Sequence, residues 1–189
     1  MEEYSDKEHL VLKEINSGKI FVGIRGTDIT NSQGKRIKDL GTDILVSMGL
    51  HRLGNRYKKS DKLVQKLIQK FGKNNVILCA HSLGSTISSD LSHKYDIESH
   101  GFNRGGTHHT FRGNMGKIFH PKHFNRAKKN HVYISMPSIT KGFDPLSLGT
   151  VIDPMANIHF VPQKKLPKSK QGILPSHSIH HFIGDKPIE

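Results

Sequence analysis

The stretch Val76-Ile-Leu-Cys-Ala-His-Ser-Leu-Gly-Ser85 joins an apolar run to a turn made of small residues. The run predicts a buried strand, and apolar residues at helical spacing follow the turn. Between them, Ala80-His81-Ser82-Leu83-Gly84 fits the pattern G-x-S-x-G, with alanine in place of the first glycine. This pattern is typical of a nucleophile elbow, a strained strand-to-helix turn that carries a reactive serine between small neighbours. Ser82 is therefore the candidate nucleophile.

The regions around this stretch predict alternating strands and helices. Helical stripes cover Leu40–Met48, Leu63–Phe71 and Leu83–Leu91, and we expect Ser60 to cap the second helix and Gly72 to end it. Apolar runs predict five strands: Ile20–Ile24, Val76–Ala80, a weak one at Ile97–Phe102, Val132–Met136 and Ile158–Val161. This order predicts an α/β fold with a mostly parallel central sheet flanked by helices. We expect long loops at 105–130 and 162–176.

Length and composition limit the class of protein. A chain of 189 residues fits one domain, so we expect a single domain over residues 1–189. The acidic start lacks the apolar core of a signal peptide, and no run approaches the roughly 18 apolar residues of a membrane span. These features predict an intracellular or particle-associated protein. The single cysteine, Cys79, excludes an internal disulfide.

The chain is strongly basic, with 29 Lys and Arg against 16 Asp and Glu, a net charge of +13. Residues 99–143 and 154–184 contain no acidic residue, so most of the excess lies in the C-terminal half. This charge favours anionic partners, such as phospholipid surfaces, nucleic acid or acidic proteins. We expect two groups of basic residues to flank the Ser82 site: Lys117, Lys122, Arg126, Lys128 and Lys129, and Lys164, Lys165, Lys168 and Lys170.

A nucleophilic serine needs a base and an acid that orients the base. In α/β-hydrolases these follow the serine in the order acid, then histidine. Asp144 comes soon after the predicted strand Val132–Met136, where it would face the ligand-binding edge of the sheet, and Asp153 is the alternative. His177 follows the last predicted strand by one loop and is the preferred base. His180 and His181 compete for that role, and a metal site of these histidines is a minor alternative.

The oxyanion of such a reaction needs two N–H donors. The residue after the nucleophile, Leu83, supplies one. Arg25-Gly26-Thr27 ends an earlier predicted strand, and Thr27 can offer both its backbone N–H and its hydroxyl. An ordinary glycine turn is the alternative interpretation of this segment.

Taken in order, these segments resemble the class 3 lipase family of α/β-hydrolases, the fungal lipase and phospholipase A1-like group. Ile24-Arg-Gly-Thr27 resembles the family's F-R-G-T oxyanion strand, and Ala80–Gly84 its elbow G-H-S-L-G. Gly101-Phe-Asn-Arg-Gly105 resembles a turn with the sequence F-N-P-G, and Asp144-Pro-Leu-Ser147 resembles D-P-V-S, which carries the acid. The segment around His177 resembles that around the family's histidine. The ordered match covers about residues 18–183.

The resemblance implies a Ser82–His177–Asp144 triad with Thr27 and Leu83 at the oxyanion, and no metal or cofactor. The chain departs from the family in its short length and in lacking an evident lid helix, which makes long-chain triglycerides a poor expectation. Arg104 replaces a proline, which we expect to loosen one turn only. A lipid ester, preferably a phospholipid or lysophospholipid at an anionic membrane, is the expected substrate. The rival hypothesis is a basic hydrolase-fold module that binds nucleic acid or an acidic partner with little or no catalysis.

Overall fold

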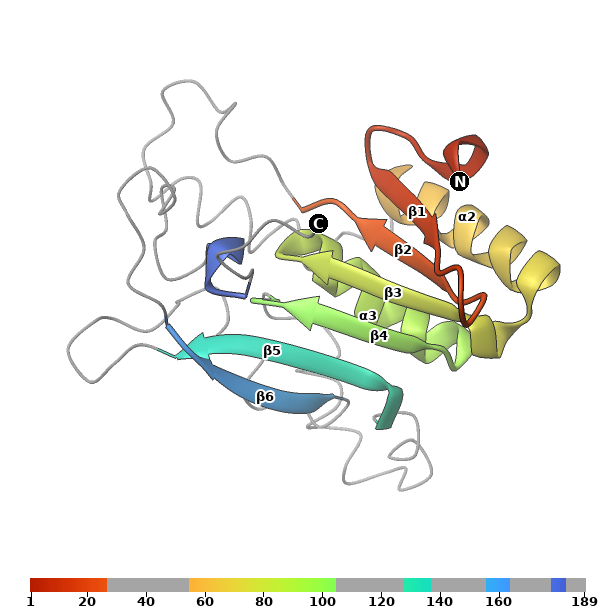
Figure 1. The fold of residues 1–189 in the computed structure, drawn as a ribbon. Coiled ribbons are helices and arrows are strands. Elements are labelled where there is room, and N and C mark those ends of the chain that lie inside the picture. Colours follow the sequence, from red (N-terminus) through yellow and green to blue (C-terminus); the bar gives the residue numbers. More distant parts are fainter. Residues whose placement is uncertain (27–54, 105–127, 137–155, 164–177, 183–189) are drawn as a thin grey trace, which may run out of the picture.

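The computed structural model describes residues 1–26, 55–104, 128–136, 156–163 and 178–182. Within these ranges six strands form one sheet in the order β1-β2-β3-β4-β5-β6 (Figure 1). Their bounds are β1 His9–Lys13, β2 Ile20–Ile24, β3 Val76–His81, β4 Glu98–Phe102, β5 Asn130–Met136 and β6 Asn157–Pro162.

Strands β2 to β6 are all parallel, and β1 pairs antiparallel with β2 at the edge of the sheet. All five predicted strands are confirmed, with bounds that differ from the predicted ones by at most two residues. The carboxyl ends of β2 to β6 therefore share one edge, called the carboxyl edge below, and their starts form the amino edge. The sequence analysis missed β1, in which only His9 and Val11 of five residues are buried.

Two helices cover one face of the sheet (Figure 1). Helix α2 spans Asn55–Phe71 and α3 spans Leu83–Tyr95. Each presents an apolar stripe to the strands because hydrophobic residues recur at helical spacing. The resulting core joins almost fully buried residues of the strands, Val11, Val22 and Leu78, to those of the helices, Val64, Leu67, Ile87 and Leu91. The α/β architecture is thus confirmed over the described residues.

The start of α2 differs from the prediction. The helix begins at Asn55, so Ser60 is not its N-cap but lies inside it, buried, with its hydroxyl donating to the Arg56 carbonyl at 2.9 Å. The predicted end is confirmed, since Gly72 has φ +82° and its N–H bonds to Ile68 O at 2.9 Å. Only glycine adopts this backbone geometry without strain. The predicted helix at Leu40–Met48 lies outside the described residues.

Among the described helices, none is both long and apolar enough to cross a membrane.

Candidate active site

Ser82 lies at the carboxyl edge, in the turn between β3 and α3. Its backbone has φ 55° and ψ −128°, a conformation that costs a non-glycine residue about 1–3 kcal/mol. The turn is held on both sides, because Ser82 N–H donates to Phe102 O at 3.1 Å and Ser82 O accepts from Ser85 N–H at 3.0 Å. Such strain clusters at functional sites, and here it falls on the residue that the sequence pattern singles out.

Glycine is required at two positions that touch this turn. A Cβ at Gly84 would lie 2.3 Å from Ile24 O and 2.9 Å from Arg25 O. A Cβ at Gly26 would lie 2.8 Å from His81 O and 3.3 Å from the Cβ of Ser82. The end of β2 therefore packs directly against the elbow, so the backbone that leads to Thr27 passes beside the serine.

A second serine stabilises the elbow. The Ser85 hydroxyl donates to Ala80 O at 2.7 Å and accepts from Phe102 N–H at 3.1 Å, which joins the ends of β3 and β4. A Cβ at Gly101 would lie only 3.0 Å from that of Ser85. Small residues at both positions thus bring the helix start close to the sheet.

The Ser82 hydroxyl is buried, with the whole residue 3% exposed. Its oxygen has no hydrogen-bond partner among the described residues. Leu83 follows as the first residue of α3, where backbone N–H groups lack acceptors within the helix. The helix N-terminus also carries a partial positive charge that favours an anion beside the serine.

The other predicted site residues, Thr27, Asp144 and His177, lie outside the described residues, as does the alternative acid Asp153. The chain just after His177 is described. There Ser178 caps the short helix η8 (Ile179–His181), and Phe182 packs its ring on Phe102 with centroids 5.2 Å apart. The Phe102 carbonyl is the one that accepts from Ser82 N–H, so this segment reaches the carboxyl edge beside the serine (Figure 1).

Arg104 is more than a turn residue. It is 1% exposed, and its guanidinium donates to the hydroxyl of Ser89 on α3. The same hydroxyl accepts from Asn130 Nδ2 at 2.6 Å, and Asn130 Oδ1 accepts from Ser99 at 2.9 Å. The expected loosened turn is instead tied to α3 and β5 through buried hydrogen bonds, which stabilise the carboxyl end of β4.

Another Ser–His–Asp chain occurs away from the elbow. Asp6 Oδ1 lies 3.0 Å from His9 Nδ1, and His9 Nε2 lies 2.8 Å from Ser60 Oγ. Ser60 is 1% exposed and its proton is used in the bond to Arg56 O, so it cannot present a free hydroxyl to a substrate. We interpret this chain as a clamp that holds the N-terminal segment on α2.

Cys79 is a weaker rival of Ser82 as a nucleophile. Burial of the thiol, followed by the negative charge of Glu98, raises the pKa of Cys79. A thiol with a raised pKa is poorly nucleophilic because the thiolate is the reactive form.

The opposite face of β4, β5 and β6 carries a cluster of rings from His100, His131, Tyr133 and His159, called the histidine cluster below. Neighbouring rings stack, with centroids 4.8–5.9 Å apart and interplanar angles of 11–26°. His131 Nδ1 lies 3.0 Å from His159 Nε2, and His100 Nε2 lies 2.9 Å from Glu98 Oε1. Across the described part of the chain, no three His, Cys, Asp or Glu side chains are grouped so that they could hold a metal ion.

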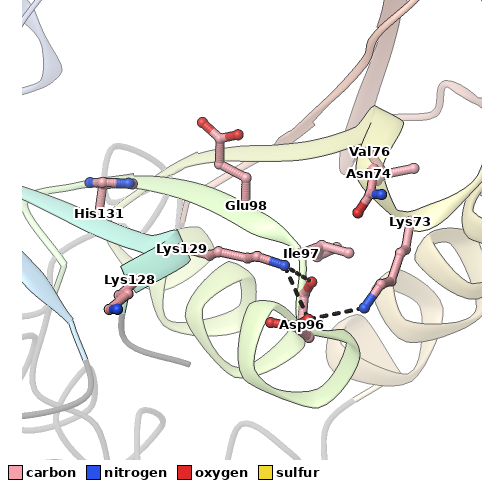
Figure 2. A pocket seen from close by; sticks show the side chains of 9 residues that line it. All are labelled: Lys73, Asn74, Val76, Asp96, Ile97, Glu98, Lys128, Lys129 and His131. Atoms are coloured by element: carbon pink, nitrogen blue, oxygen red, sulfur yellow. Dashed lines mark hydrogen bonds and ion pairs between the residues drawn. The ribbon is translucent and has the colours of Figure 1, made fainter. Parts of the chain in front are cut away.

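A cavity of about 310 Å³ lies at the amino edge (Figure 2). Val76, at the start of β3, lines it, whereas Ser82 follows the end of that strand. Lys128 and Lys129 line it, so these two lysines do not flank the Ser82 site as expected. They precede β5, and the start of a parallel strand lies at the edge opposite its end. Lys73 Nζ and Lys129 Nζ each lie 3.0 Å from Asp96 Oδ2, and these two hydrogen bonds lower the pKa of Asp96. Lys73 and Lys129 are therefore paired with a carboxylate inside the cavity. The remaining basic residues of the two predicted groups lie outside the described residues.

No protein-family model matches the chain, and a search of curated proteins finds no relative for it.

Proposed function

We propose that this protein is a serine hydrolase of carboxylic esters, with the α/β-hydrolase fold of the class 3 lipase type. The observation that carries the proposal is Ser82, a non-glycine residue at φ 55° between a parallel strand and a helix N-terminus. The glycine contacts and the Ser85 hydrogen bonds support it, because an elbow requires both close packing and a rigid turn. The parallel sheet adds support, since its shared carboxyl edge is where such folds bind ligands.

In the proposed reaction, Ser82 Oγ attacks the ester carbonyl while His177 accepts its proton. Asp144 orients His177 and stabilises the imidazolium. The N–H groups of Leu83 and Thr27 bind the oxyanion of the tetrahedral intermediate, which collapses as His177 protonates the leaving alcohol. Water then attacks the acyl-enzyme by the reverse sequence of proton transfers. The contact of Phe182 with Phe102 supports the choice of His177, because it brings the chain near that histidine to the edge that holds Ser82.

We propose a lipid ester as the substrate, with phospholipid or lysophospholipid preferred. The net charge of +13 supports attraction to anionic lipid surfaces. Hydrolysis through a triad needs no metal or cofactor. The alternative, a nucleic-acid-binding module, is less well supported. Proteins that stack bases use ring faces, whereas the rings of the histidine cluster stack on one another across neighbouring strands.

The test compares Ser82, which lies at the elbow, with Ser60, whose hydroxyl is bonded to the ring of His9. Wild-type protein, Ser82→Ala and Ser60→Ala are treated with a fluorophosphonate, which reacts with an activated serine and loses fluoride, and the labelled peptide is identified by mass spectrometry. Hydrolysis of a soluble short-chain ester is measured in parallel. We expect Ser82→Ala to lose labelling and to lower turnover by several orders of magnitude, as in other triad enzymes.

Ser60→Ala serves as the matched control, because it removes a buried hydroxyl bonded to histidine but leaves the elbow intact. It should keep labelling and turnover near the wild-type values. Near wild-type turnover in folded Ser82→Ala, or labelling at any other residue, would refute the assignment of Ser82.

A further inference from the structure

Arg56 reaches from the first turn of α2 to the end of β2. Its Nη2 donates to the carbonyl oxygen of Arg25 and lies 3.5 Å from that of Gly26, the outer limit of a hydrogen bond. Thirty residues separate the guanidinium from Gly26, so this is a tertiary contact between two elements. The Arg56 side chain is half-buried.

The two carbonyls belong to the backbone that packs on the elbow. Arg25 O faces the Cα of Gly84, where a Cβ would approach it to 2.9 Å, and Gly26 lies against His81 and Ser82. On its other side, Arg25 N–H donates to Glu8 O at 3.0 Å. Arg56 therefore contacts a segment whose other neighbours include the nucleophile and the first turn of α3.

We propose that Arg56 is a positioning residue for the oxyanion donor that follows Gly26. The inference rests on the proposed function, in which Thr27 N–H binds the oxyanion. The carbonyl of Gly26 and the N–H of Thr27 belong to one peptide unit, and in a trans peptide the two groups point in opposite directions. A guanidinium that bonds to the carbonyl of Arg25 and lies within reach of the carbonyl of Gly26 restricts the rotation of this peptide unit, and with it the direction of the N–H.

The chemistry of arginine suits this role. Its planar, permanently charged group offers several donors in a fixed geometry and can bridge two acceptors, whereas a lysine ammonium acts as a single point charge. Lys59, one turn along the same helix, provides a matched control. It lies 3.7 Å from Glu8 Oε2 and is therefore a cation of α2 near the same segment, but it bonds to neither carbonyl of the β2 end.

The functional test uses full-length Arg56→Met, Arg56→Lys and Lys59→Met, each checked for folding by circular dichroism. We expect Arg56→Met to lower kcat on a soluble ester about 10-fold or more with KM little changed, because the lost alignment matters only in the transition state. The inhibition constant of an alkyl boronic acid, which forms a tetrahedral adduct on serine, should rise by a similar factor. Arg56→Lys should fall between Arg56→Met and wild type, and Lys59→Met should stay within about 2-fold of wild type.

A second measurement does not depend on activity. Amide hydrogen exchange at Arg25 and Gly26 should be faster in Arg56→Met than in wild type or Lys59→Met. If Arg56→Met does not fold, Arg56→Gln replaces it with the same expected ranking. A folded variant without the guanidinium that keeps wild-type kcat, inhibitor binding and exchange overturns the inference. A wild-type protein that is inactive and unlabelled overturns the proposed function, and the exchange data then decide whether Arg56 holds the segment.

Discussion

At Ser82 the backbone conformation favours glycine, so the serine side chain lowers the stability of the turn. Its φ of 55° with ψ of −128° suits glycine, yet the position holds a residue with a Cβ and a buried hydroxyl. The hydrogen bonds from Ser82 N–H to Phe102 and from Ser85 N–H to Ser82 keep the strained turn in place. A non-glycine residue in this conformation costs about 1–3 kcal/mol of stability, which indicates that the serine side chain has a role other than folding.

This reasoning predicts an inverted stability order for two variants of Ser82. Glycine normally destabilises a structured position by roughly 0.5–1 kcal/mol relative to alanine. At position 82 the Cβ of alanine retains the strain and glycine relieves it, so Ser82→Gly should be more stable than Ser82→Ala by about 0.5–2 kcal/mol. Urea unfolding of the two proteins measures the difference. The ordinary order, with alanine more stable, would show that the turn is not strained.

Among the elements, the β3–α3 unit and the parallel strands could be predicted because their apolar runs and stripes are local signals. The missed strand β1 is short and, within the described residues, pairs with β2. Its exposed residues Leu10 and Leu12 are apolar, so the sequence lacks the alternation of apolar and polar residues that would indicate a half-buried strand. The wrong cap at Ser60 has a tertiary cause. The first turn of α2 is mostly polar, although Tyr57 packs against the core, and it is anchored by Arg56 on the β2 end. His9 bonds to Ser60 one turn later.

The residues of the candidate site also fall into those that a local sequence pattern predicts and those that depend on tertiary contacts. Ser82 and Leu83 lie where the local pattern places them, because strand, turn and helix follow one another in the sequence. The roles of Arg56 and Arg104 depend on partners 15 or more residues away, and no local pattern marks such contacts. Thr27, Asp144 and His177 remain predictions from the order of motifs.

The histidine cluster predicts that the stability of the β4–β6 part of the sheet depends on pH. Burial, then the neighbouring charges of His100 and His159, lower the pKa of His131 from 6.5, with Glu98 opposing; Tyr133 and His100 also face it across the strands. A lowered pKa means that the unfolded chain binds more protons than the folded protein near and below pH 6.5, so stability falls as the pH drops through this range. The short His131–His159 contact acts in the same direction, because two charged imidazoles cannot share it.

The free energy of unfolding should therefore fall between pH 7.5 and 5.5, and His131→Gln should show a smaller fall than wild type. Urea unfolding at the two pH values measures both. His180→Gln removes a histidine of η8 outside the cluster and should behave as wild type. Equal falls for wild type and His131→Gln would assign the pH dependence to other groups.

At the scale of the whole molecule, the charge is distributed over both edges of the sheet. Lys128 and Lys129 lie at the amino edge, and there Asp96 pairs with Lys73 and Lys129 (Figure 2). Lys13 ends β1 opposite Ile20, and Lys19 directly precedes β2, so both belong to the same edge. Lys164, Lys165 and Lys168 follow the end of β6 in the sequence, outside the described residues, and the sequence analysis predicts that they flank the Ser82 site.

This division allows the membrane hypothesis to be tested at constant net charge. Strands of five to seven residues separate the edges by about 15–20 Å, which exceeds the Debye length of about 10 Å in 0.1 M salt. If the Ser82 mouth faces an anionic membrane, lysines at the carboxyl edge contribute on the order of 1 kcal/mol each to binding and lysines at the amino edge contribute little. We compare Lys164→Glu/Lys165→Glu/Lys168→Glu with Lys13→Glu/Lys19→Glu/Lys128→Glu, two triple variants of equal charge.

Hydrolysis of phosphatidylglycerol-containing vesicles should fall steeply in the first triple variant and stay near wild type in the second. Hydrolysis of a soluble short-chain ester should be unaffected in both, because an uncharged substrate is not attracted by surface lysines. Equal losses on vesicles in the two variants would mean that the field of the whole protein, and not the orientation of its active edge, attracts the membrane. A loss on the soluble ester in the first variant alone would place those lysines in the substrate site itself, because attraction to a membrane plays no part in the hydrolysis of a soluble ester.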